Sequence, residues 1–476
     1  MISHVSPLGW ISLLLLCFVL ATAESSGDDR LQRIANGEVE EKQATCAQPH
    51  PVLGDQKEAL GLSFKNRNEL GAILEQRGFK VGAELGFQRG LFAETTLTQW
   101  RSAKTYLLVD VWAQQNNSKD NVASRPPKFD DETQRRLEPF RAKGVDIPVC
   151  RTAVCVQRFP DHYFDYIYVD AGHNFETLYA HLVEWWPKLR PRGILAGLDF
   201  VPQDWTRNLN GRKFRIDTAG AVSKGVVNRF AAEQGVKVTS SLQEAWPTWA
   251  IVKPALEVTM ATYTNRAARF PVAMRVNEEY SVHYGYKRVV ENGTSLPLQW
   301  HAAWRKIEVI NNMLADNATD VVFLIDDDAF VNHYWLSVDS FLARYPHRDF
   351  IIGLEDRRSH VLHRINTGVI IIRNTAWSRA FFASVFQQPR QVCNYPKTAP
   401  WHEQDCMTNL LDRTNAWEHV AEVPLGEFNC CDGNRVYKGT CAPFVFHGMG
   451  FQKEQVELVA SRVREKMSTW GFQHKM

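Results

Sequence analysis

One stretch, DVVFLIDDDAFV from Asp320 to Val331, constrains the fold of this chain more than any other. Its apolar first half is typical of a buried strand, and it runs into three adjacent carboxylates, Asp326, Asp327 and Asp328. Adjacent carboxylates repel one another unless a divalent cation neutralises them. Hard cations such as Mg²⁺ and Mn²⁺ bind carboxylate oxygens and keep open positions for substrate phosphates. The stretch therefore predicts a metal–diphosphate site; the alternative is a solvated loop or a helix cap.

Strand and helix patterns alternate over most of the chain. KVGAELGF, TYLLVDVW, FDYIYVDAG, RGILAGLDF and TWAIVKP read as short buried strands, with helical patterns such as ETLYAHLVEWWPKL between them. A second set of strands begins at LEVTMATYT and continues through GYKRVVEN, DVVFLIDD, DFIIGLED and NTGVIIIRN. Such alternation predicts an α/β protein with mostly parallel sheets. We expect two domains, residues 51–254 and residues 255–476, divided near Val252 to Ala255.

The N-terminus has the pattern of a secretory signal. The apolar run from Leu8 to Leu20 precedes Ala21-Thr22-Ala23, which is a small-x-small cleavage pattern. We expect a signal peptide over residues 1–23, a linker over residues 24–50, and a protein of the secretory pathway, in the Golgi lumen or secreted. The alternative is an uncleaved signal anchor, and only that form would associate with a membrane.

Charge and cysteine content narrow the partners and the compartment. The chain has 55 basic and 53 acidic residues and a formal net charge of +2, which gives no argument for a nucleic-acid partner. Of the nine cysteines, eight lie beyond the N-terminal apolar run, and an even number favours disulfides in an oxidising compartment. Asn116, Asn292 and Asn317 are glycosylation acceptors if the chain enters that compartment.

A glycine-containing turn and a spaced acid mark the first domain. The strand KVGAELGF runs through Gly86 and Gly90 into the helical pattern FAETTLTQW, and Asp110 ends the next strand. Glycines at a strand-to-helix turn let the backbone approach a ligand, and an acid about 20 residues further on can accept hydrogen bonds from ribose hydroxyls. The alternative is an ordinary α/β turn with a capping aspartate.

The region from about Phe79 to Lys253 resembles class I methyltransferases, in the subgroup with a strand that ends Val-Asp-x-x-His. The resemblance rests on Glu84-Leu85-Gly86-x-x-x-Gly90, LLVDVW and DYIYVDAGHNFETLYAHLVEWWPKLRPRGILAGLDF. It implies a Rossmann-like sheet that binds S-adenosylmethionine through Glu84, Gly86, Gly90 and Asp110. Phe87 and Gln88 depart from the family's fuller Gly-x-Gly-x-Gly pattern.

Further acids in the same region imply a second cofactor. Some relatives hold a divalent metal on acids at the ends of the fourth and fifth strands, and Asp170 and Asp199 occupy those positions. A metal there would lower the pKa of a substrate hydroxyl so that its oxygen attacks the methyl group. His173 is the alternative general base, or a histidine that caps the following helix.

The region from Leu256 to Lys453 resembles the GT-A glycosyltransferases, most closely the retaining family of plant xyloglucan xylosyltransferases and fungal α-galactosyl- and α-mannosyltransferases. Matching segments occur in the family's order: Trp304-Arg305-Lys306, LIDDDAFV, NTGVIIIRNTAWS from Asn366, HEQDCMTNLL from His402, and FVFHGMGFQK around His447. HEQD departs from the Asp-Asp-Gln of many relatives, and FNCCDGNRVYKGTC has no clear counterpart.

This second resemblance implies a metal site, a donor site and a set of candidate reacting groups. Mn²⁺ or Mg²⁺ on Asp326, Asp328 and His447 would stabilise the charge that grows on a departing nucleoside diphosphate. For His447 the alternative is a buried hydrogen-bonded histidine, and for Gln404 it is a residue that satisfies backbone groups at a helix start. The implied donor-binding residues are Thr262, Tyr263, Arg266, Lys306, Asn366, Thr367, Gly368 and Lys453, and the groups nearest the reacting carbon are Glu403, Gln404 and Asp405.

Together these patterns predict a two-domain enzyme of the secretory pathway. We expect a metal-dependent retaining glycosyltransferase that takes a nucleotide-sugar donor and a glycan or glycoprotein acceptor, fused to an O-methyltransferase-like domain. One alternative keeps only the glycosyltransferase active beside a non-catalytic, ligand- or partner-binding first domain. Another is a protein that binds sugars without chemistry.

Overall fold

The computed structural model describes residues 62–87, 89–110, 126–150, 153–171, 175–201, 206–209, 212–215, 218–241, 244, 246–293, 303–354, 365–387, 402–424, 426–430, 443–448 and 452–473. The predicted signal peptide over residues 1–23 and the linker over residues 24–50 lie outside these ranges, as do Asn116 and His173. The described residues include no helix long and apolar enough to cross a membrane.

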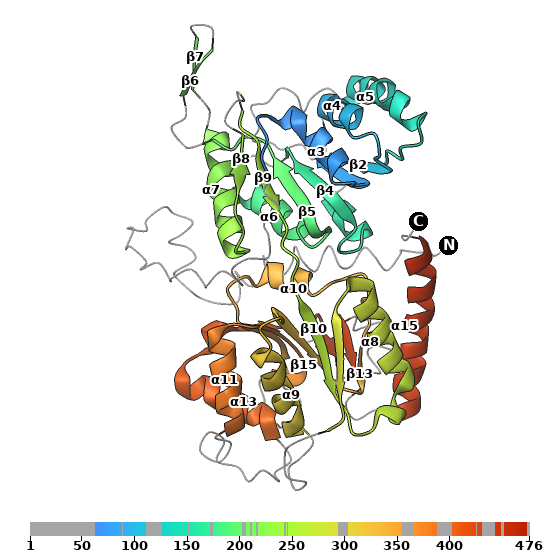
Figure 1. The fold of residues 1–476 in the computed structure, drawn as a ribbon, viewed down its shortest axis with the longest axis vertical. Helices are drawn as coiled ribbons and strands as arrows, with labels where there is room; N and C mark the ends of the chain where they lie inside the picture. Colours follow the sequence, from blue (N-terminus) through green and yellow to red (C-terminus); the bar gives the residue numbers. More distant parts are fainter. Residues whose placement is uncertain are drawn as a thin grey trace, which may run out of the picture.

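Two separate sheets confirm the α/β class (Figure 1). The first has the order β3-β2-β1-β4-β5-β9-β8, in which β3, β2, β1, β4 and β5 run parallel and β9 is antiparallel to both of its neighbours. Its strands are β1 (Val81–Leu85), β2 (Thr105–Val109), β3 (Val149–Cys150), β4 (Phe164–Val169), β5 (Leu189–Gly197), β8 (Thr239–Ser240) and β9 (Trp249–Val252). We call this sheet and its helices the first unit.

Helices cover both faces of the first sheet because its strands are apolar on both sides. In β2, Leu107 and Val109 enter one core while Tyr106 and Leu108 enter the other, as the two-residue period of a strand requires. One face packs against α3 (Leu70–Gln76), α4 (Leu91–Gln99) and α5 (Pro126–Arg141), and the other against α6 (Phe175–Trp185) and α7 (Thr218–Glu233). Smaller elements are η1 (Arg67–Glu69), η2 (Ala153–Arg158) and the hairpin β6 (Thr206–Leu209) and β7 (Arg212–Arg215).

The second sheet is mixed, with the order β11-β10-β12-β15-β14-β16. Strand β15 is antiparallel to its neighbours β12 and β14, whereas the other pairs are parallel. The strands are β10 (Val258–Tyr263), β11 (Lys287–Glu291), β12 (Val321–Ile325), β14 (Phe350–Leu354), β15 (Ile365–Arg373) and β16 (Val420–Val423). We call this sheet and its surroundings the second unit.

Two layers enclose the second sheet. One face packs against α9 (Ala303–Ala315), α11 (Ala376–Gln387) and α13 (His402–Thr414). The other packs against α8 (Pro271–Tyr284), α15 (Lys453–Gln473) and a small sheet of β13 (Ala329–Val331), β18 (Val445–His447) and β17 (Asn429–Cys430). Shorter elements are η3 (Ala267–Arg269), η4 (Trp417–His419) and α10 (Asp339–Arg344), which lies between the two large sheets (Figure 1).

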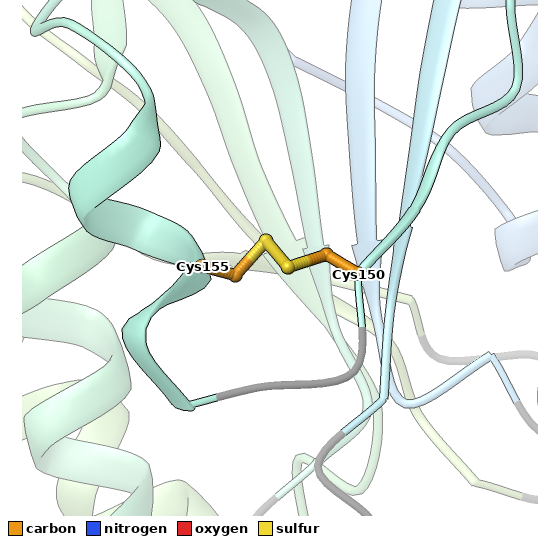
Figure 2. Close-up of a disulfide and its surroundings, with 2 residues drawn as sticks. All are labelled: Cys150 and Cys155. Carbon is orange, nitrogen blue, oxygen red and sulfur yellow. A yellow bond between two sulfur atoms is a disulfide. The ribbon is translucent and has the colours of Figure 1, made fainter. Parts of the chain in front are cut away.

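A disulfide joins Cys150, at the end of β3, to Cys155 in η2 (Figure 2). Both cysteines are buried in the core of the first unit. The bridge closes a short loop beside the edge of the sheet where Asp110 lies, because the Asp110 backbone N–H donates to the Cys150 carbonyl at 3.0 Å.

Candidate functional site

Three potential metal ligands converge at the end of the second sheet. Asp326 and Asp328 lie in the turn that follows β12, and His447 ends β18. The antiparallel register pairs His447 with Ala329, directly after the aspartates, so the imidazole reaches the same turn. His447 Nε2 lies 3.5 Å from Asp328 Oδ1 and 3.8 Å from Asp326 Oδ2. Among the described residues this is the one group of three such side chains whose ligand atoms lie within 4.8 Å of one another.

The donor set fits a divalent cation. Two carboxylates and one imidazole suit Mn²⁺ and leave coordination positions open for other ligands. Burial raises the pKa of Asp326, despite the nearby Lys306 and His447, so its negative charge is costly in the metal-free protein. Burial would raise the pKa of Asp328 too, but its hydrogen bond with His447 and the nearby Arg266 lower that pKa to about 2. A cation at this turn would offset the charge of both aspartates.

Strand β15 supports this turn from the other side. The Asp326 backbone N–H donates to the Gly368 carbonyl at 2.9 Å. A Cβ built on Gly368 would lie 2.1 Å from Cε1 of His447, closer than any side chain tolerates. The absence of a side chain at Gly368 therefore lets the imidazole reach the aspartates.

Lys306 links the metal turn to the start of α13. Its Nζ lies 2.9 Å from Asp326 Oδ2 and 3.3 Å from Glu403 Oε1, and it is buried. Burial alone would lower the pKa of the Lys306 ammonium, but the two carboxylates outweigh it and raise that pKa. The side chain is thus held between two protein carboxylates, which makes it a positioning group more than a free cation for substrate.

The side chains at the start of α13 face β15. Thr367 Oγ1 donates to Glu403 Oε1 at 2.7 Å, and the Thr367 backbone N–H donates to Gln404 Oε1 at 2.9 Å. Burial would raise the pKa of Glu403, but Lys306 and Thr367 lower it below its ordinary value. Asp405 is half-buried one position further along the helix. Glu403 therefore stays ionised inside the protein, and the carboxamide oxygen of Gln404 is occupied.

Asn366 and Asn429 form a buried amide pair beside this strand. Asn366 Oδ1 accepts from the Gly368 backbone N–H and from Asn429 Nδ2, both at 3.0 Å. Asn366 and Thr367 were both predicted to contact the donor. Their side chains are buried and hydrogen-bonded within the protein.

The middle aspartate of the triplet makes different contacts from its neighbours. Asp327 accepts from Arg266 Nε at 3.0 Å and Nη2 at 2.9 Å, and from Thr264 Oγ1 at 2.7 Å. Arg266 Nη2 also lies 3.5 Å from Asp328 Oδ2, while 42% of its side chain stays exposed. Asp327 thereby orients Arg266 next to the metal turn. Prediction from sequence treated Asp327 only as part of the triplet, although its place between two ligands on alternate positions was a usable signal.

Three other residues that were predicted to bind the nucleotide-sugar donor have different surroundings. Thr262 is buried, and its hydroxyl accepts from Arg288 Nη2 at 2.9 Å. Tyr263 is half-buried and accepts a hydrogen bond from the guanidinium of Arg305. Lys453 is exposed at the first position of α15. The Thr262 hydroxyl is thus engaged in a hydrogen bond within the protein.

In the first unit the predicted residues gather at the carboxyl edge of the sheet. The order β2-β1-β4-β5 places Asp110, Gly86, Asp170 and Asp199 next to the ends of four adjacent parallel strands. The Gly86 backbone N–H donates to the Val109 carbonyl at 2.7 Å, and that of Asp170 donates to the Leu85 carbonyl at 2.8 Å. In open α/β sheets, this edge is where ligands bind.

The two glycines of the turn have left-handed backbones, with φ of +87° at Gly86 and +68° at Gly90. A Cβ on Gly86 would lie 2.2 Å from the Asp170 carbonyl oxygen, so the glycine lets the ends of β1 and β4 meet. Gly90 directly precedes α4. The Gly90 backbone N–H donates to the Phe87 carbonyl at 2.8 Å, so the N–H groups of both glycines are bonded within the protein. Asp110 beside the turn is half-buried, a position that fits the ribose contact of an S-adenosylmethionine site.

Glu84 does not point to that edge as a free carboxylate. It is 2% exposed and accepts a hydrogen bond from the Tyr106 hydroxyl at 3.0 Å. Burial raises its pKa to about 8, with the negative charges of Asp170 and Asp110 adding to the shift. The Glu84 carboxyl is thus neutral at pH 7 and acts as a core hydrogen-bonding group.

The structure describes only some of the residues predicted for a second metal site. Asp170 and Asp199 are both half-buried, and Asp199 has a left-handed backbone with φ of +63°. Neither belongs to a three-ligand group among the described residues, and His173 lies outside them. The electrostatic influence of Asp170 on Arg67, which precedes α3, was not foreseen from the sequence.

Comparison with known proteins bears on the first unit. Residues 83–200 match the family model of a methyltransferase domain, which covers Glu84, Gly86, Gly90, Asp110, Asp170 and Asp199. No curated protein matches the chain. The region of the match and the sheet topology together identify the first unit as a methyltransferase-like domain with a Rossmann-like sheet.

Three solved structures are each similar to part of this chain. A glycosyltransferase involved in the glycosylation of the major capsid of PBCV-1 is 17% identical over 43% of this chain and 99% of its own, with a TM-score of 0.36. An O-methyltransferase from Bacillus cereus in complex with SAH is 16% identical over 41% and 84%, with a TM-score of 0.28. The O-methyltransferase TomG from Streptomyces achromogenes in complex with SAM is 17% identical over 41% and 82%, with a TM-score of 0.28.

Proposed function

We propose that residues 255–476 are a metal-dependent retaining glycosyltransferase domain that uses a nucleotide-sugar donor, fused to an S-adenosylmethionine-dependent O-methyltransferase domain over residues 51–254. The observation that carries the glycosyltransferase part of the proposal is the convergence of Asp326, Asp328 and His447 from two separate strands. Three such groups, two of them acidic, have little reason to meet in a partly buried turn unless a cation joins them.

The surrounding residues suit the departure of a nucleoside diphosphate. A bound Mn²⁺ or Mg²⁺ would supply positive charge where the leaving diphosphate becomes more negative. Lys306 holds the Asp326 carboxylate at 2.9 Å. Arg266, held by Asp327 and partly exposed, is the cation available to phosphate oxygens beside the turn. Lys306 is thus a buried cation that pairs with the proposed metal ligand Asp326, and Arg266 is a partly exposed cation for the donor.

Retention of configuration is proposed from the resemblance to retaining enzymes, with the start of α13 as the nearest reacting face. Glu403 is paired with Lys306 and Thr367, and Gln404 Oε1 accepts from Thr367. These contacts orient the two side chains against β15. We assign no nucleophile among Glu403, Gln404 and Asp405.

The methyltransferase half is supported by the family match over residues 83–200 and by the acid-lined sheet edge. Asp110 and the backbone of Gly86 to Gly90 would hold S-adenosylmethionine, which supplies an electrophilic methyl group when bound. Asp170 and Asp199 would place the acceptor hydroxyl at the same edge. The buried, neutral Glu84 supports β1 from inside the core rather than binding ribose.

We place this activity on glycans or glycoproteins in the secretory pathway, in the Golgi lumen or outside the cell. The motivation is the N-terminal signal pattern, together with the exposure of Asn292 and Asn317 at the surface of the second unit. Both positions are accessible to a glycosylating enzyme.

The test is a screen of nucleotide sugars for turnover by the full-length chain with and without Mn²⁺. We expect turnover that requires the metal and is lost by at least about a hundredfold in Asp326→Asn and Asp328→Asn, the scale of losing one group that stabilises transition-state charge. Asp320→Asn is the matched control, because the Asp320 carboxylate accepts from the Glu257 backbone N–H at the far end of the same strand. Full turnover by both ligand variants in the presence of chelator would reject the proposal.

A second candidate keeps the glycosyltransferase and makes the first unit a non-catalytic binding domain. The observation that favours it is Glu84, which the resemblance assigns to the cofactor but which is turned into the core. Labelled S-adenosylmethionine distinguishes the two. Saturable binding with methyl transfer to a glycan supports the bifunctional enzyme, and absence of binding supports the second candidate.

A further inference from the structure

Where the first and second units meet, each unit places one buried carboxylate among hydrogen-bond donors of the other. Asp161 belongs to the loop before β4 of the first unit, and Asp339 begins α10 of the second. Each is less than 10% exposed. Figure 1 shows α10 between the two large sheets, and Ala343 of this helix packs in the core of the first unit.

Asp161 is bonded mainly by groups of the second unit. Its Oδ2 accepts from the Ser337 backbone N–H at 2.6 Å, the Ser337 hydroxyl at 2.8 Å and the Ser340 hydroxyl at 2.7 Å. Its backbone N–H donates to the Trp335 carbonyl at 2.9 Å. Lys188 of the first unit, 2.7 Å from Oδ1, balances the charge.

Asp339 shows the reverse arrangement. Its Oδ2 lies 2.8 Å from Lys253 Nζ and 2.6 Å from His162 Nε2, both from the first unit. Lys253 also donates to the Trp186 and Leu189 carbonyls at 3.0 Å and 2.7 Å, so its ammonium makes two hydrogen bonds within the first unit besides its pairing with Asp339. Each unit thus supplies a carboxylate to the donors of the other.

This reciprocal bonding favours one orientation of the first unit relative to the second. A buried charge is tolerated only where its partners satisfy it with good geometry, and a shift of either unit would leave Asp161, Asp339 and Lys253 with broken bonds. A flexible tether between independent domains would bring no such requirement, because interfaces of that kind are more polar and hydrated.

The docked segment continues into the metal turn. After Asp328 the chain forms β13, and Ser337, which bonds to Asp161, follows nine positions after Asp328. Between them the Tyr334 carbonyl accepts from the Tyr284 hydroxyl at 3.0 Å, so the connection is held along its length.

We propose that the methyltransferase-like unit is a permanent structural partner of the second unit, and that its docking through Asp161 and Asp339 holds the segment that carries the metal-binding aspartates. The first unit is then needed for metal binding whether or not it transfers methyl groups. This inference goes beyond either proposed reaction, although it uses the proposed metal site as a reporter.

The experiment compares Mn²⁺ affinity and calorimetric unfolding in full-length variants. We expect one unfolding transition for the unmodified protein, and weaker Mn²⁺ binding by about threefold to thirtyfold in Asp161→Asn and Asp339→Asn, the usual scale of coupling between sites. Ser340→Ala, which removes a single hydrogen-bond donor, should also weaken Mn²⁺ binding, but by a smaller factor. This variant decides the question if an aspartate variant does not fold.

Asp165→Asn is the matched control. Asp165 is equally buried, and it accepts from the Val81 backbone N–H at 2.8 Å and pairs with Arg190, both within the first unit. It should lower the transition temperature and leave Mn²⁺ affinity unchanged. Two independent transitions in the unmodified protein, or unchanged Mn²⁺ affinity in all three docking variants, would overturn the inference. Unmodified protein that binds no Mn²⁺ would contradict the metal proposal itself, and the number of transitions would then decide the docking.

Discussion

A side chain on Gly368 would collide with His447, since its Cβ would lie 2.1 Å from the imidazole Cε1. The imidazole occupies the space that the missing side chain leaves, between β15 and the aspartate turn. This relationship makes a glycine a requirement for the candidate metal centre.

Gly368→Ala should therefore displace His447 and weaken Mn²⁺ binding by about tenfold to a hundredfold, comparable to the loss of a group that orients a metal ligand. Gly225→Ala is the control, because a Cβ there meets nothing within 4 Å and Gly225 lies inside α7. Titration with Mn²⁺ followed by electron paramagnetic resonance measures both. Equal affinity in the two variants would contradict the proposed position of His447.

Asp327→Asn should affect donor binding without removing a metal ligand. The change weakens the two hydrogen bonds from Arg266 to the carboxylate and releases the guanidinium from its place beside the turn. We expect the KM for the donor to rise by about threefold to tenfold, the scale of about 1 kcal/mol for a charged hydrogen bond that is weakened but not abolished, with unchanged Mn²⁺ affinity. Steady-state kinetics at saturating Mn²⁺ measures this, and a loss of metal binding would show that Asp327 is itself a ligand.

Glu84→Gln should remove a pH dependence of stability. The pKa of Glu84 is about 8 in the folded protein and near 4.5 when unfolded, so the folded state binds the extra proton between these values. The stability from this group is complete below about pH 4.5 and is lost as pH rises through about 8. Glutamine mimics the neutral acid, so the variant should keep stability that the unmodified protein loses, on the order of 5 kcal/mol by pH 9. Denaturant unfolding from pH 5 to pH 9 compares them, and parallel curves would show that Glu84 is ionised.

Asp110→Ala should weaken S-adenosylmethionine binding by about 1.5–3 kcal/mol, the scale of hydrogen bonds to a charged group. Asp199→Ala should leave that binding unchanged and abolish methyl transfer, because its proposed role is to place the acceptor hydroxyl. Calorimetry on the full-length chain is the measurement, since the first unit is docked on the second. Undiminished binding in the Asp110 variant would keep the cofactor and discard this site.

The compartment makes a separate prediction. Mature protein should begin near Glu24 and carry a glycan on Asn292 or Asn317, both of which are exposed. Mass spectrometry of protein from a secretory host, with and without glycosidase, gives both results. An intact Met1 on protein without glycans would contradict the assignment to the secretory pathway.

The sequence by itself determined the elements and their class. Runs such as FDYIYV and GVIII are rich in apolar and aromatic residues, and a segment of that kind forms a strand buried on both faces, as β4 and β15 are. Local chemistry also placed Asp326 to Asp328 in a turn and the glycines of Gly86 to Gly90 at the start of a helix, because both depend on near neighbours in the chain.

Only the tertiary structure decided which side chains meet and which of them are free. Lys306, Thr262 and Glu84 are polar residues at positions the resemblances assign to ligands, yet each is bonded inside the protein by a partner 20 or more residues away. Asp161 and Asp339 carry no sequence signal, since each accepts hydrogen bonds from side chains of the opposite unit. Strand periodicity is set by residues two apart, whereas these pairings depend on the order of strands in the sheets and on how the units dock. That order follows from burying the whole chain at once, which no local pattern records.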